Sequence, residues 1–170
     1  INKDKINIKS NDYKNQKIKI NSKIDLNPFY IDSKIIFIKK DFEFIIDNIL
    51  KYLLSIDKEL LGNINGKLDL NLQNLDNEII DSGKIRLIIS EKSIKVLESY
   101  FEINNVGIIK SNYSFKENLG EIIFKSNNIL EISNKNEFAK KFQLNANKVQ
   151  KIKKIYFDLQ KNIDTDEVLI

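Results

Sequence analysis

Hydrophobic and polar residues alternate over most of this 170-residue chain. The stretch 17–26 (KIKINSKIDL) places an apolar or small residue at every second position, and the shorter stretch 6–9 (INIK) does the same. The spacing recurs at 64–72, at 85–89 and at 155–159. Successive side chains of a β-strand point to opposite faces of a sheet, so period two predicts strands that are half buried. The chain is therefore predicted to be mainly β.

Short apolar runs lie between the alternating segments, at 35–38, 108–109, 122–124 and 129–130. They predict strands that are apolar on both faces or that carry a bulge. Residues typical of turns separate the runs, namely Asn27-Pro28, Asp81-Ser82-Gly83, Asn104-Asn105, Glu117-Asn118-Leu119-Gly120 and Asn127-Asn128. A spacing of roughly ten residues between such turns is typical of an antiparallel meander.

One segment follows helical spacing instead. Its apolar residues are Phe42, Ile45, Ile46, Ile49, Leu50, Leu53 and Leu60. Asp41 is placed as an N-cap and Gly62 as a stop, which predicts an amphipathic helix over about 41–61. A short helix is predicted over about 136–142, where Phe138 and Phe142 are four residues apart. The expected fold is α+β: an antiparallel meander or half-open curved sheet with these two helices, forming a single β-rich domain over 1–170.

Composition excludes most enzyme chemistry. The chain has no His, Cys, Met or Trp, which removes thiol nucleophiles, imidazole acid/base catalysis and the usual zinc ligands. The string Gly62 to Lys67 (GNINGK) lacks the spacing and the Ser/Thr of a phosphate loop. The acidic group Asp164, Asp166 and Glu167 lacks the glycine and the closing Glu of a calcium loop. We expect a protein that is not an enzyme, with no catalytic residues, no metal site and no cofactor.

The charge pattern does not favour nucleic acid as a partner. The net charge is +4, the Lys residues are scattered, and Arg86 is the single arginine. The most apolar stretch, 42–56, is too short and too polar to cross a bilayer. Because residue 1 is Ile and the last residues (DTDEVLI) end in a strand-like run, we expect a fragment of a longer protein, with any signal or membrane anchor outside it.

The order of elements resembles the AsmA-like family of Gram-negative envelope proteins, the AsmA, TamB and YhdP group. The run LGNINGKLDLNLQNL (61–75) resembles a strand opening that recurs in that family, and a Gly-led strand (GKIRLIIS, 83–90) follows it. A strand pair closing on a glycine comes next (YSFKENLGEIIFKS, 113–126). The stretch 136–164 (NEFAKKFQLNANKVQKIKKIYFDLQKNID) resembles the family's C-terminal region.

The resemblance implies a β-sheet rolled into a half-open groove in the periplasm, tethered to the inner membrane by a helix outside these residues. Its apolar interior would assist phospholipid transport or outer-membrane homeostasis between the two membranes, with acyl chains as the partner. The chain departs from the family pattern because it has no membrane helix and because the predicted helix interrupts its strands. It would then be a terminal or capping portion.

Candidate lipid-facing residues are the apolar members of four predicted strands. They are Leu68, Leu70, Leu72, Ile85, Leu87, Ile89, Ile122, Phe124, Ile155, Phe157 and Leu159. A hairpin between the first two strands would align their apolar residues in one patch. The same residues would also form an ordinary core between sheet and helix, and the sequence leaves both readings open. The alternative function is a structural or adhesive β-repeat module without lipid.

Overall fold

The computed structural model describes residues 4–10, 17–40, 64–90, 93–118, 121–162 and 168–169. The strands are β1 (Lys5–Lys9), β2 (Ile18–Leu26), β3 (Phe29–Ile38), β4 (Asn65–Gln73), β5 (Ile80–Ser90), β6 (Ser93–Ile103), β7 (Gly107–Asn118), β8 (Glu121–Ile132), β9 (Lys154–Asn162) and β10 (Val168–Leu169). The helices are α3 (Lys135–Lys141) and α4 (Ala146–Val149). The chain is mainly β, as the period-two pattern predicts. The predicted helix at 41–61 lies outside the described residues.

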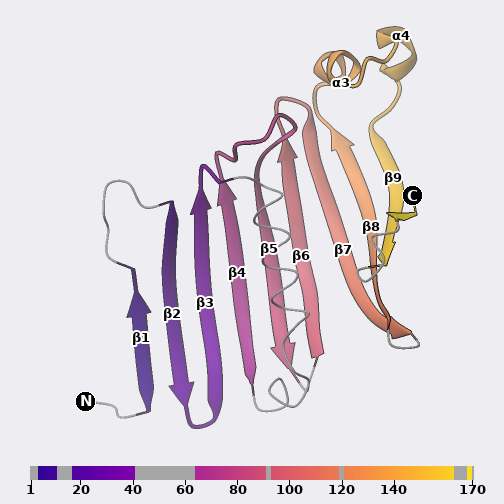
Figure 1. The fold of residues 1–170 in the computed structure, drawn as a ribbon. Helices are drawn as coiled ribbons and strands as arrows, with labels where there is room; N and C mark the ends of the chain where they lie inside the picture. Colours follow the sequence, from indigo (N-terminus) through magenta and orange to yellow (C-terminus); the bar gives the residue numbers. More distant parts are fainter. Residues whose placement is uncertain are drawn as a thin grey trace.

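All ten strands belong to one open sheet, and they lie side by side in chain order (Figure 1). Neighbouring strands are antiparallel except β3 and β4, which are parallel. The sheet is thus mainly antiparallel, as predicted, with one parallel pair that the sequence pattern did not indicate. Parallel neighbours cannot be joined by a tight turn and need a crossover of a dozen or more residues. The chain between Ile38 and Asn65 supplies that length.

A glycine allows the parallel pair to form. Gly66 is paired with Ile31, and a Cβ on Gly66 would lie 2.5 Å from the Ile31 carbonyl oxygen. No side chain fits at that distance, so the close approach of the two backbones requires glycine. In the sequence Gly66 belongs to the phosphate-loop-like string. In the structure it is a strand residue that packs against its neighbour.

Two predicted turns lie inside strands. Asn127 and Asn128 pair with Asn112 and Ser111 in the middle of the β7–β8 hairpin, because both strands supply polar partners there. The triplet Asp81-Ser82-Gly83 belongs to β5. Gly83 packs under Phe101, whose ring atom Cδ1 would lie 2.5 Å from an added Cβ. These residues are typical of turns, but here they serve cross-strand packing.

The turn before β5 forms a few residues earlier. Asn77 Oδ1 accepts hydrogen bonds from the backbone N–H groups of Ile79 and Ile80, at 2.9 and 2.8 Å. The predicted turns at Asn27-Pro28 and Asn104-Asn105 are confirmed, and Asn105 takes the left-handed conformation with φ 55°. Asparagine tolerates that conformation better than most residues.

The short helix is confirmed as α3. Asn134 caps it, since its Oδ1 accepts from the Glu137 N–H at 3.2 Å. The rings of Phe138 and Phe142 lie one turn apart, with centroids 5.0 Å from each other. Figure 1 shows α3 and α4 beyond the ends of β8 and β9. The four-residue helix α4, which no pattern predicted, lies between α3 and β9.

Candidate functional site

Strand register collects the apolar residues on one face of the sheet. Directly paired residues point to the same face. Ile20 pairs with Ile35, Ile35 with Leu70, and Leu70 with Ile85, which forms one row across β2 to β5. We call the side that carries this row the apolar face. The opposite side, which carries Lys67, is the polar face.

Ten of the eleven candidate lipid-facing residues, all except Ile122, share the apolar face. In the β4–β5 hairpin Leu68 pairs with Leu87, and Leu70 with Ile85, which aligns the two sets as predicted. The remaining members follow by register. Leu72 and Ile89 pair with Gly83 and Gly66, while Phe124 and Ile122 are in β8, and Ile155, Phe157 and Leu159 are in β9. Whether they contact lipid stays a prediction, and the side chain of Ile122 is outside the described part of the structure.

The candidates in the centre of the sheet are buried. Leu70 and Leu72 are 1% exposed and Leu87 is 2% exposed. With Leu75, Ile85 and Phe101 they form one hydrophobic core cluster. Leu68, Ile89, Phe124, Ile155, Phe157 and Leu159 are half-buried. Four of the candidates, Leu70, Leu72, Ile85 and Leu87, therefore lie in a packed core.

A second core cluster lies where the helices meet the apolar face. Phe138, Ala139 and Val149 pack against Leu130 and Ile103 at the end of the sheet from which α3 starts. Val106, in the β6–β7 turn, is fully buried in the same cluster. The two short helices thus cover one end of the apolar face over β6 to β9.

The apolar face is open over the first strands. The exposed residues there are Ile6 and Ile8 of β1, Ile18, Ile20 and Leu26 of β2, and Phe29 of β3. Ile24, Ile31, Ile35 and Phe37 lie between them and are half-buried. We call these ten residues the open apolar patch. Contiguous exposed apolar patches on soluble proteins mark interaction surfaces.

The sequence pattern predicted strands at eight of these ten residues, all except Phe29 and Ile31, but none of the ten was among the lipid-facing candidates. The signal was present, because Ile18, Ile20, Ile24 and Leu26 alternate with Lys and Asp. Periodicity shows which side of a strand is apolar, but it does not show how much of that side the rest of the fold covers. Burial separates the open patch from the central core.

Polar side chains on the apolar face are hydrogen-bonded to one another or to the backbone. Ser33 Oγ donates to Ser22 Oγ at 2.7 Å. Further along, Ser99 Oγ donates to the Ser111 carbonyl at 2.9 Å, and Asn128 Nδ2 donates to Ser126 Oγ at 2.9 Å. Buried polar groups are tolerated when they are paired in this way. They form no arrangement for catalysis.

Tyr113 belongs to the same region of the apolar face. Its ring stacks on Phe124, with centroids 5.2 Å apart. Burial raises the pKa of the Tyr113 hydroxyl, and hydrogen bonds with Ser111 and Ser99 offset only part of that rise. The hydroxyl is therefore neutral at physiological pH and acts as one more member of a structural network.

The polar face is crossed by ion pairs between neighbouring strands. Arg86 Nε donates to Asp69 Oδ1 at 2.8 Å, and Lys67 Nζ lies 3.2 Å from Asp69 Oδ2. Burial would raise the pKa of Asp69, but the hydrogen bonds from Arg86 and Lys67 outweigh it and hold that pKa below its usual range. The single arginine is thus engaged in the sheet.

Glu131 carries the second ion-pair group. Its carboxylate accepts from Lys110 Nζ at 2.7 Å and from Lys154 Nζ at 2.8 Å. These hydrogen bonds lower the pKa of Glu131 to about 2, and the same contact raises the pKa of Lys154. Both effects stabilise the charged forms. The polar face is a charge-paired solvent face.

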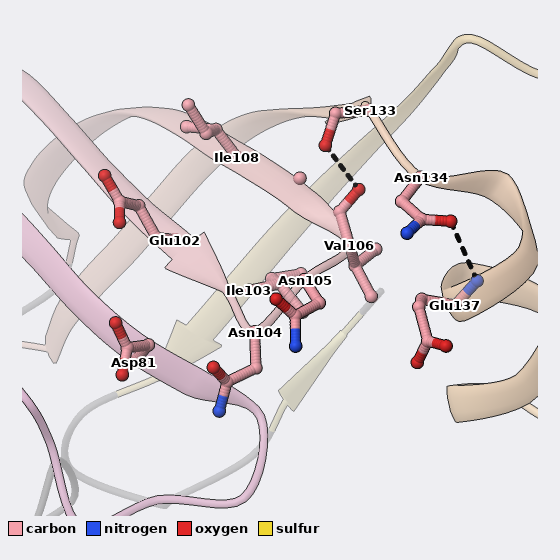
Figure 2. A pocket seen from close by; sticks show the side chains of 11 residues that line it. Asp81, Glu102, Ile103, Asn104, Asn105, Val106, Ile108, Ser133, Asn134 and Glu137 are labelled. Atoms are coloured by element: carbon pink, nitrogen blue, oxygen red, sulfur yellow. Dashed lines mark hydrogen bonds between the residues drawn. The ribbon is translucent and has the colours of Figure 1, made fainter.

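A pocket of about 700 Å³ lies at the end of the sheet beside α3. Asp81, Glu102 and Glu137 line it, and Figure 2 shows the carboxylates of Asp81 and Glu102 on one side of the view and that of Glu137 on the other. Ser133 Oγ donates to the Val106 carbonyl at 3.0 Å, and Asn134 caps the helix. These polar groups serve the local fold and do not converge on one point.

The described residues contain no group of three or more acidic side chains able to hold a metal ion. The acidic group Asp164, Asp166 and Glu167 lies outside them. Within the same residues, no helix is long and apolar enough to cross a membrane. Neither finding tests the expectation that the protein is not an enzyme.

Comparison with known proteins returns no match: no family model, no curated protein and no solved structure matches the chain. A proposal for the function of the chain therefore has to be argued from its fold and from the distribution of its side chains.

Proposed function

We propose that this chain is a non-enzymatic β-sheet module that accommodates phospholipid acyl chains on its open apolar patch. The module would assist phospholipid transport or outer-membrane homeostasis in the cell envelope. The AsmA-like resemblance implies that the module lies in the periplasm. It would be part of a protein that is tethered to the inner membrane by a segment outside these residues.

The observation that carries the proposal is the uneven covering of the apolar face. In the row Ile20, Ile35, Leu70, the exposed fraction falls from 38% at Ile20 to 1% at Leu70. Covering the exposed members with an apolar ligand is favourable by about 25 cal/mol per Å² removed from water. Acyl chains suit such a surface because they cover apolar side chains without needing any hydrogen-bonding groups from the protein.

The dimensions of the patch suit an acyl chain. The nine residues of β2 extend over about 30 Å at roughly 3.3 Å per residue. The hydrocarbon core of a bilayer is about 30 Å thick, so one acyl chain needs about half of that length. Three strands side by side give the patch a width of about 10 Å, at about 4.8 Å between strands. One or two acyl chains fit along it.

The test compares two neighbouring residues of one strand. Ile20 lies in the open apolar patch, while Asn21 is exposed on the polar face. We expect Ile20→Asp to lower crosslinking to a phospholipid carrying a photoreactive acyl chain at least tenfold, because a carboxylate cannot be covered by hydrocarbon without a large desolvation penalty. Asn21→Asp adds the same charge on the other face and should leave crosslinking unchanged. Equal crosslinking of both variants, or none with the unmodified chain, would overturn the proposal.

The alternative function, a structural β-repeat module without lipid, draws on the sheet edges. Among the described strands β1 pairs only with β2, and β10 pairs only with β9. Exposed edges are templates for further strands. In that case the open apolar patch would be covered by protein. The chain would then self-associate increasingly as its concentration rises, in the absence of lipid. Sedimentation at several protein concentrations separates this function from lipid binding.

A further inference from the structure

A shallow hollow of about 750 Å³ interrupts the polar face over β6 to β9. Four residues that line it form one row by register: Tyr100 pairs with Lys110, Lys110 with Ile129, and Ile129 with Tyr156. The two tyrosines stand at the ends of this row. Their Cα atoms are three strand spacings apart, or about 14 Å at about 4.8 Å per spacing.

The tyrosines are unusually open to solvent. Tyr156 is 69% exposed and Tyr100 is 39% exposed. The apolar Ile108 and Ile129 lie in the same hollow. The doubled apolar residues Ile108-Ile109 and Ile129-Leu130 explain their presence, because adjacent residues of a strand point to opposite faces. Each pair thus supplies one residue to the core and one to the hollow.

Amide and carboxylate groups flank the tyrosine row. Asn112, Asn127 and Asp158 form the adjacent row, by direct pairing. Asn127 Nδ2 donates to Asp158 Oδ1 at 2.8 Å. This contact occupies Oδ1 and leaves Oδ2 of the Asp158 carboxylate as a further acceptor in the lining. Asn112 offers both an amide donor and an acceptor. The hollow therefore combines two exposed aromatic rings with groups that bind hydroxyls.

The charge of the hollow disfavours anionic ligands. Its single ammonium group, that of Lys110, is paired with Glu131 at 2.7 Å. Glu102 and Asp158 add two carboxylates to the lining. A phosphate-bearing ligand would meet negative charge with no unpaired cation in the lining. A purely apolar ligand would cover the Asn112 amide and Asp158 Oδ2 without bonding to them, which is unfavourable. A neutral ligand rich in hydroxyl groups satisfies both requirements.

We propose that this hollow binds a short neutral oligosaccharide, with sugar rings packed on Tyr100 and Tyr156 and with hydroxyls bonded to Asp158 and Asn112. A pyranose ring presents C–H groups on its faces and hydroxyls at its rim, so an aromatic ring covers the face while amides and carboxylates bond the rim. The span between the tyrosines fits an oligosaccharide better than a single sugar. This site lies on the opposite face from the open apolar patch and does not depend on lipid binding.

The chain offers a matched control for the test. Tyr30 is also 39% exposed on the polar face, but it lies in β3, outside the hollow. Since the chain contains no Trp, its intrinsic fluorescence comes from its six tyrosines, two of which, Tyr100 and Tyr156, line the hollow. The probes are the soluble β-1,4-linked hexamers of glucose and of N-acetylglucosamine, titrated to millimolar concentration.

We expect at least one hexamer to quench the fluorescence of the unmodified chain with a saturable curve. Tyr156→Ala should weaken its binding at least tenfold, while Tyr156→Phe, which keeps the ring, and Tyr30→Ala should bind within twofold of the unmodified chain. Asp158→Asn should weaken binding several-fold and leave unfolding by urea unchanged. Failure of both hexamers to bind, or equal losses in Tyr156→Ala and Tyr30→Ala, would overturn the proposal. Binding of phospholipid vesicles that is lost in Tyr156→Ala would assign the hollow to lipid instead.

Discussion

Changes in the free energy of unfolding can show how well each part of the apolar face is covered. The row Ile20, Ile35, Leu70 offers suitable sites for this comparison. Ile20 and Leu70 lie two strands apart on the same face and differ in exposure, at 38% and 1%. We compare Ile20→Ala with Leu70→Ala. Both remove aliphatic carbon from the same side of the sheet, so the difference between them reports how well each site is covered.

The expected magnitudes follow from burial. Leu70 loses its full transfer term and leaves a cavity among its core neighbours, so Leu70→Ala should lower the free energy of unfolding by about 2–5 kcal/mol. Ile20 already exposes more than a third of its side chain, and solvent fills the space that is left. Its transfer term alone, about 1–2 kcal/mol, is then lost. At the middle of each range, the loss for Leu70→Ala is about twice that for Ile20→Ala.

Urea unfolding followed by circular dichroism measures both losses, from midpoints at a common slope. Asn21→Ala, on the polar face of β2, serves as the control and should change stability by no more than about 0.5 kcal/mol. A loss for Ile20→Ala as large as that for Leu70→Ala would mean that the first strands belong to the core. Such a result would remove the physical basis of the open apolar patch.

Two further predictions concern the strands themselves. Gly66→Ala should lower the free energy of unfolding by about 1–3 kcal/mol, because the added Cβ would meet the Ile31 carbonyl. Asn65→Ala, at the exposed start of β4, is the control. Equal effects of the two substitutions in urea unfolding would contradict the argument that the two backbones approach closely at Gly66. The pKa of Glu131 is about 2 in the folded chain and close to its ordinary value of 4.5 in the unfolded chain. Its contribution to stability is therefore complete above pH 4.5 and is lost as the pH falls toward 2. Glu131→Gln should flatten stability over that range, and an unchanged pH profile in this variant would refute the role of its lysine partners.

Strand faces were predictable from the sequence because period two depends only on local geometry. Leu68, Leu70 and Leu72 alternate with Lys67, Asp69 and Asn71, and the structure keeps the two sets on opposite faces. The β4–β5 alignment was also predictable, since two apolar strands joined in a hairpin bury their apolar sides together. Helix α3 was predictable from Phe138 and Phe142, whose spacing of four residues is a local signal.

The parallel pairing of β3 with β4 was not predictable in this way. It depends on where a long connection returns, and no local pattern encodes that return. Asn127-Asn128 failed as a turn for a related reason. Their polarity suggests a turn when read along the chain, whereas across the sheet they face Asn112 and Ser111. The tyrosine row was missed because Tyr100 and Tyr156 are 56 positions apart and meet only through register.

The geometry of the sheet separates the two proposed sites. The open apolar patch lies on one face of β1 to β3, and the oligosaccharide hollow on the other face of β6 to β9. Between the two sites, Leu70 and Leu87 pack on one side of β4 and β5. Arg86 and Asp69 form an ion pair on the other side of these strands. From β2 to β9 there are seven strand spacings, or about 34 Å at about 4.8 Å each. Substitutions more than about 10 Å apart that share no partner have additive effects. A loss of lipid crosslinking in Ile20→Asp therefore carries no consequence for saccharide binding, and each function stands or fails by its own variants.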